Sequence, residues 1–84
     1  MADLITMRNI GKELERKLNL TGIESAEDLI SIGSKEAYFK LKLRFPGVCS
    51  VHLYALQGAI DNIDFNMLSE ETKKDLKAFS DKLK

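Results

Sequence analysis

Cysteine is almost absent from this sequence, and Cys49 is the only one. No disulfide can form within the chain, and one free thiol suits a reducing compartment. The chain also has a single histidine, His52, so it is short of the thiolates and imidazoles from which a closed, four-ligand zinc site is usually built. We expect no structural metal and no cofactor.

Long hydrophobic runs are missing as well. No apolar stretch approaches the length that crosses a bilayer, and the N-terminus lacks the basic region and apolar stretch of a secretory signal. Nothing in the sequence directs the protein out of the cytoplasm. We therefore expect a cytoplasmic protein that makes no contact with a membrane.

An excess of charge of either sign is also missing. Thirteen basic and thirteen acidic residues cancel, so no overall field draws the protein onto nucleic acid or an anionic membrane. Binding to nucleic acid would have to depend on a local group of basic side chains.

What the sequence does have is helical periodicity. Its 44% apolar and 31% charged residues are typical of a globular domain, and the apolar residues recur three and four apart rather than in strict alternation. Glycine, proline and serine residues that suit helix ends separate these repeats, with Gly33 as a helix stop and Ser34 as the next cap. Six helical segments are predicted, over about residues 3–8, 12–20, 25–32, 34–45, 48–63 and 69–83.

The most apolar of these segments, over residues 48–63, is expected to lie near the centre of the fold. Its predicted inner face consists of Val48, Val51, Ala55, Leu56, Ala59 and Ile63. Short connections and alternating caps favour a compact orthogonal array over a long bundle. The predicted fold is a single all-α domain over residues 1–84, with five or six short helices.

The turn Asn9-Ile10-Gly11 resembles that of a helix-hairpin-helix module, in which a Gly-hydrophobic-Gly turn presents the first amides of a helix to a phosphate. Asn9 and Gly11 tolerate unusual backbone angles, and Ile10 can anchor the turn in the core. Basic residues surround the turn. The candidate phosphate-binding set is Arg8, Asn9, Ile10, Gly11, Lys12 and Arg16.

A structural interpretation of the same turn stays open. Asn9 and Gly11 can serve only to reverse the chain, while the nearby bases are surface charges partnered by Glu13 and Glu15. The missing first glycine and the zero net charge both favour this interpretation, since a binder led by phosphate contacts usually presents more bases.

Two pairs of reactive side chains have the spacing of a site but lack the rest of one. Cys49 and His52 can share a helix face, yet no further ligand or orienting residue accompanies them, so a core thiol and a partly buried or surface imidazole are expected. Asp61 and Asp64 have no further acid near them in sequence, and helix capping explains them more simply. We expect no enzymatic activity.

Two apolar residues fall beside the predicted inner face of the fourth segment. Phe39 and Leu43 lie to the side of the stripe of Ala37, Leu41 and Phe45. They can form an exposed strip for a protein partner or a second copy of the chain. A wider buried face explains them equally well.

The order of landmarks resembles the C-terminal domain of the TfoX/Sxy family, bacterial regulators of competence for DNA uptake. The most specific part is the run from Leu53 to Ala59. The residues that carry the resemblance are Asn9-Ile10-Gly11, Leu14, Leu18, Gly22-Ile23, Glu27-Asp28-Leu29, Gly33, Glu36-Ala37-Tyr38 and Leu53-Tyr54-Ala55-Leu56-Gln57-Gly58-Ala59.

This resemblance implies an all-helical domain related to helix-hairpin-helix and SAM-like folds, in a transcription-associated setting. Family members often carry an α/β domain before this one, so the chain is expected to be a stand-alone copy. The family supplies no active site to carry over. Within the Leu53 to Ala59 run, Gly58 and Ala59 are expected to let another helix approach closely.

Two functions follow as hypotheses. The first is a non-enzymatic regulatory module that binds DNA, or a DNA-bound transcription factor, through the Asn9-Ile10-Gly11 turn, in a setting linked to competence. The alternative is a protein-interaction adaptor, able to self-associate, that uses Phe39 and Leu43 and does not bind nucleic acid.

Overall fold

Five α-helices make up most of the fold. A computed structural model of the chain describes residues 2–83. Over this range the elements are the 3₁₀ helix η1 (Leu4–Thr6), α1 (Lys12–Leu20), α2 (Ala26–Ile32), α3 (Ser34–Arg44), α4 (Ser50–Asp61), the 3₁₀ helix η2 (Phe65–Met67) and α5 (Glu70–Lys82), with no strand. The predicted all-α fold is confirmed, although the first predicted segment is only a 3₁₀ turn and the pattern does not predict η2.

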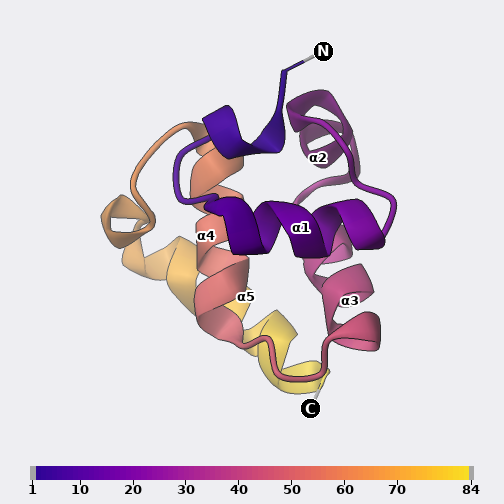
Figure 1. Cartoon of the computed structure of the whole chain (residues 1–84). Helices are drawn as coiled ribbons and strands as arrows, with labels where there is room; N and C mark the ends of the chain where they lie inside the picture. The colour runs from indigo at the N-terminus through magenta and orange to yellow at the C-terminus, as the bar shows by residue number, and fades with distance from the viewer. Residues whose placement is uncertain (1, 84) are drawn as a thin grey trace.

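The helices are arranged around α4 (Figure 1). Helices α3 and α5 and the η2 turn all pack against α4, while α2 packs against α3. Helix α1 runs across the front of this group in the view of Figure 1 and contacts α3. The helices therefore cross one another, as expected for an orthogonal array, instead of lying side by side in a long bundle.

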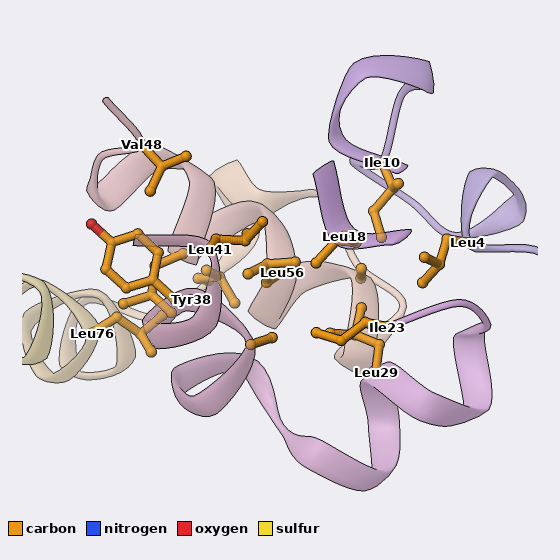
Figure 2. Packing of buried hydrophobic residues seen from close by; sticks show 14 residues of the cluster. Leu4, Ile10, Leu18, Ile23, Leu29, Tyr38, Leu41, Val48, Leu56 and Leu76 are labelled. Carbon is orange, nitrogen blue, oxygen red and sulfur yellow. The ribbon is translucent and has the colours of Figure 1, made fainter. Parts of the chain in front are cut away.

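One hydrophobic core joins these helices (Figure 2). It extends from Val48, Tyr38 and Leu76 at one end, through Leu41, Leu56 and Leu18, to Ile23, Leu29, Ile10 and Leu4 at the other. Burying each leucine contributes about 1.5–3 kcal/mol. The hydroxyl of the fully buried Tyr38 lies 2.9 Å from Ser80 Oγ, so a buried hydrogen bond joins α3 to α5.

Two of the three serine residues predicted to cap a helix do so in the structure. Ser25 Oγ accepts a hydrogen bond from the Asp28 amide and Ser69 Oγ accepts one from the Thr72 amide, each at 3.1 Å, as the sequence predicts. Ser34 is not a cap. Gly33, at φ 88°, takes the cap position in a backbone conformation that suits glycine, and Ser34 becomes the first residue of α3, buried and donating to Gln57 Oε1.

Two residues predicted to be in the core lie outside it. Val51 is 50% exposed and Cys49 is exposed. The reason is that α4 begins only at Ser50, so its first turn lies at the edge of the core and complete burial begins at Leu53.

Gly58 lies in close contact with the Asn9 side chain, the loop after α4 and the first residue of η2, Phe65. A Cβ atom at Gly58 would lie 2.5 Å from Asn9 Nδ2 and 2.8 Å from the carbonyl oxygen of Ile63. No α-helix is among the three nearest neighbours of this Cβ position; the close approach is made by Asn9 and by the segment from Ile63 to Phe65, where η2 begins. The glycine leaves room for the side chain of Asn9 and for the loop that follows α4.

We predict that Gly58→Ala destabilises the domain by up to about 2 kcal/mol. Alanine gains about 1 kcal/mol of helix propensity, but the new methyl group has to displace the Asn9 side chain and a backbone carbonyl, and overpacking costs about 1–3 kcal/mol. Urea denaturation measures the change. In the control Gly47→Ala nothing lies within 4 Å of the added Cβ atom, so stability should change by about 0.5 kcal/mol or less. A stabilised Gly58→Ala variant would contradict the packing argument.

Candidate nucleic-acid interface

The turn before α1 reverses the chain at Asn9. Asn9 has a left-handed backbone with φ 70°, and Ile10 is 5% exposed and belongs to the core, as predicted. Gly11 differs from the expectation, because it has an extended backbone with φ −94° and forms the N-cap of α1. The turn needs a tolerant residue at position 9, since only there is the backbone left-handed.

The side chain of Asn9 is fully used within the protein. Its Nδ2 donates to the carbonyl oxygens of Ile63 at 3.0 Å and Ala55 at 3.4 Å, and its Oδ1 accepts from the amide of Phe65 at 3.3 Å. Asn9 thereby ties the turn to the middle of α4, to the loop that follows α4 and to the start of η2. Near Asn9 the backbone is left to contact an anion, whereas the side-chain carboxamide of Asn9 is not.

The start of α1 is open. Gly11 provides no side-chain cap, and among residues 2–83 the backbone amides of Lys12, Glu13 and Leu14 donate no hydrogen bond, the first bond of the helix being that from Glu15 to Gly11. Gly11 and Lys12 are exposed. These amides therefore have the free donors and the positive helix-dipole end that can hold an anion.

The charges around this helix start divide into two groups. Arg8 and Lys12 are exposed, and no ion pair to either forms within residues 2–83. Arg16 instead donates twice to the Glu13 carboxylate, at 2.6 and 3.3 Å. This pair lowers the pKa of Glu13 and raises the pKa of Arg16. Of the predicted bases, Arg8 and Lys12 are thus the two whose charge is not already matched.

A hollow of about 330 Å³ lies beside the start of α1. Its lining is Asn9, Gly11, Glu13, Leu14, Lys17, Val51, His52, Ala55 and Phe65. The hollow brings the starts of α1 and α4 together, so a ligand at the turn would also meet the first turn of α4. Spacing along the chain cannot predict this, because the two helix starts are separated by two other helices.

Cys49 and His52 close the start of α4. His52 Nδ1 accepts a hydrogen bond from the Cys49 amide at 3.1 Å, and the Cys49 sulfur lies 3.7 Å from the same nitrogen. The pair therefore acts as a helix cap. Within residues 2–83 no group of three potential ligands accompanies it that could hold a metal ion.

The two aspartates also have structural partners. Asp64 caps η2 by accepting from the Asn66 amide at 2.9 Å, and Asp61 accepts from Gln57 Nε2 at 3.0 Å. Capping explains Asp64, as the sequence indicates.

Phe39 and Leu43 do not line the hollow beside the turn. They are 38% and 69% exposed, which rules out the wider buried face that the sequence left open. Together with Pro46 and Leu83 they line a shallow groove. The sequence pattern predicts the two α3 residues but not their neighbours, because Leu83 comes from the far end of α5.

These features define a five-helix, all-α domain in which the helix after the first turn starts without a side-chain cap. A profile of the family described as "TfoX C-terminal domain" matches residues 1–80. The chain therefore belongs to the TfoX C-terminal domain family, and the resemblance seen in the sequence is confirmed. This domain is not known as a catalytic one.

Two crystal structures of Listeria monocytogenes proteins are similar over nearly their whole length. One, in a triclinic form, is of an uncharacterized protein and has 40% identity and a TM-score of 0.95, covering 98% of this chain and 93% of its own. The other, in a tetragonal form, is of a protein of unknown function and has 39% identity and a TM-score of 0.94, covering 98% and 100%. No curated protein matches the sequence. No helix within residues 2–83 is long and apolar enough to cross a membrane.

We predict that Asn9→Asp destabilises the domain by about 2 kcal/mol. Aspartate tolerates the left-handed backbone nearly as well as asparagine, but it lacks both donors and brings a carboxylate against two carbonyl oxygens, and an unsatisfied buried group costs about 1–3 kcal/mol. Thermal or urea unfolding measures the change in stability. Asn19→Asp, at an exposed position of α1, is the matched control and should change stability little. Equal stability of the two variants would show that the Asn9 bonds do not hold the turn.

His52 should make stability depend on pH. Partial burial lowers the pKa of His52 below 6.5, and the charge of Lys17 lowers it further. The unfolded chain therefore takes up a proton before the folded one does, so the free energy of unfolding falls as pH drops below about 6.5. His52→Gln keeps an acceptor for the cap and should remove this slope, as measured by urea denaturation between about pH 7.5 and 5. An unchanged slope in the variant would assign it to other groups.

Proposed function

We propose that this domain is a non-enzymatic regulatory module that contacts the DNA backbone through the start of α1, directly or as part of a complex with a DNA-bound regulator. The observation that carries the proposal is the row of three unpartnered amides at Lys12, Glu13 and Leu14, beside the unpaired charges of Arg8 and Lys12. Free amides at a helix start, together with nearby bases, are a common way to hold a phosphate.

Comparison with the capped helices indicates what the start of α1 lacks, although α3, with Gly33 at its cap position, lacks a side-chain cap as well. Ser25 accepts from one first-turn amide of α2 and Ser69 from one of α5, while at α4 the His52 imidazole accepts from the amide of Cys49 at the cap position. Helix α1 has no such side chain, because Gly11 occupies its cap position. An external acceptor would cap the start of α1 in the way that a serine caps α2 and α5.

The acids near this start limit how strongly it binds. Glu13 is held by Arg16, and the Glu15 carboxylate accepts a hydrogen bond from the Ile5 amide at 3.0 Å. Both carboxylates therefore have partners, yet they add negative charge close to a phosphate. We infer a weak contact with one or two phosphates, sensitive to salt and without base recognition of its own.

The chain belongs to the TfoX C-terminal domain family, and its resemblance to the TfoX/Sxy regulators of competence supports a role in transcription linked to competence. No catalytic constellation is part of the proposal. Cys49, His52, Asp61 and Asp64 act in capping and in local hydrogen bonds, and the described residues bring no nucleophile, base and orienting group together.

We predict that the domain binds duplex DNA at low salt and that affinity falls as salt rises, with a logarithmic slope of about −0.9 for each phosphate that the domain neutralises. Arg8→Glu combined with Lys12→Glu should abolish binding in a fluorescence anisotropy assay. Both side chains are exposed, so the double variant should unfold at the wild-type temperature.

A matched control separates the site from general charge. Lys74→Glu combined with Lys82→Glu makes the same change in net charge on α5, where both residues are exposed. This control should retain most of the affinity, apart from a small general decrease. Binding that survives the reversal at Arg8 and Lys12, or that both double variants abolish equally, would exclude the α1 start as the phosphate site.

A further inference from the structure

An apolar groove of about 540 Å³ lies between the C-terminal half of α3 and the end of α5. Its walls are Phe39, Lys42, Leu43, Pro46 and Leu83. In Figure 1 the end of α5 lies beside the connection from α3 to α4, which contains Pro46. Leu43 is 69% exposed although it is one of the larger apolar side chains. Exposed apolar side chains gathered in a groove are typical of a docking surface.

Lys42 fixes the loop that forms one wall of the groove. Lys42 Nζ donates to the carbonyl oxygens of Pro46 at 2.9 Å and Val48 at 2.8 Å. These bonds hold the loop against α3 and keep the ammonium group of Lys42 on the loop, while its apolar stem lines the groove. Apolar surface is thus already formed there before any partner binds.

The surroundings of the groove are positively charged. Lys40 follows Phe39 and Arg44 follows Leu43 in the sequence of α3. Because residues four apart lie on the same face of a helix, Lys40 and Arg44 form a row beside the row of Phe39 and Leu43. Both are exposed, and among the described residues neither has a carboxylate partner. No acid lines the groove within residues 2–83. The neighbouring Asp81 of α5 lies 3.6 Å from Lys77, with which it forms an ion pair.

An apolar groove with a positively charged edge favours one kind of binding partner over the others. A second copy docking through the same face would bring Lys40 and Arg44 against their own counterparts, which is unfavourable. Duplex DNA would match the charge but would leave Phe39, Leu43, Pro46 and Leu83 without apolar contacts. A protein segment with apolar side chains flanked by carboxylates satisfies both the groove and its edge.

We propose that the Phe39–Leu43 groove binds an acidic, apolar segment of a partner protein. Apolar side chains of that segment insert between Phe39, Leu43 and Leu83, and its carboxylates pair with Lys40 and Arg44. The groove shares no residue with the start of α1, so this proposal stands or falls separately from the phosphate contact.

Selection from a display library of random peptides of about 16 residues, long enough for a short helix in a groove, tests the proposal. The wild-type domain is the bait, and the Leu43→Asp domain depletes peptides that bind elsewhere. The enriched peptides should carry net negative charge and paired apolar residues. In anisotropy titrations they should bind Leu43→Asp about tenfold more weakly or worse, since an aspartate at this position cannot bury the apolar area that the leucine buries.

Two further variants sharpen the test. Met67→Asp introduces the same charge at a side chain that is 72% exposed on η2, and it should bind the selected peptides like the wild type. Lys40→Glu combined with Arg44→Glu should weaken binding and reduce its dependence on salt. Peptides that are neutral or basic, that bind Leu43→Asp equally well, or that fail to be enriched would overturn the proposal. A dimer in sedimentation equilibrium, or DNA binding, that depends on Leu43 would also overturn it.

Discussion

The contact between Asn9 and α4 is the constraint on which the arrangement of the candidate site depends. Three hydrogen bonds join this one side chain to Ala55, Ile63 and Phe65, and the missing side chain of Gly58 leaves the room for them. Asn9 is tied inward and Ile10 is a second anchor in the core, so the chain reaches the surface only at Gly11. Helix α1 consequently begins at the surface, with its first amides exposed.

The two proposed surfaces arise from different physical features. At the start of α1 the feature is a set of backbone donors without acceptors, flanked by Arg8 and Lys12. On α3 and α5 it is apolar area without a cover, beside Lys40 and Arg44. Both combine local positive charge with an unmet interaction in a chain whose total charge is zero. Taken together, the two proposals describe a module that would join a nucleic acid to an acidic protein segment.

Much of the fold could be predicted because its signals are local. The apolar spacing predicted every α-helix, and Ser25 and Ser69 act as the caps that their positions indicate. Predictions failed where a neighbour distant in sequence decided the outcome. Ser34 looks like a cap but turns onto Gln57, and Gly58 looks like a helix contact but accommodates Asn9.

The sequence by itself determined the all-α class, the family and the residues around the first turn, because periodicity, caps and motif order are written along the chain. Only the tertiary structure decided that Asn9 serves the fold, that Arg16 is neutralised by Glu13, and that Leu83 completes a groove with Phe39 and Leu43. The physical reason is that the availability of a donor, a charge or an apolar surface depends on what packs against it in space. Asn9 and Ile63, or Leu43 and Leu83, meet only once the helices have crossed.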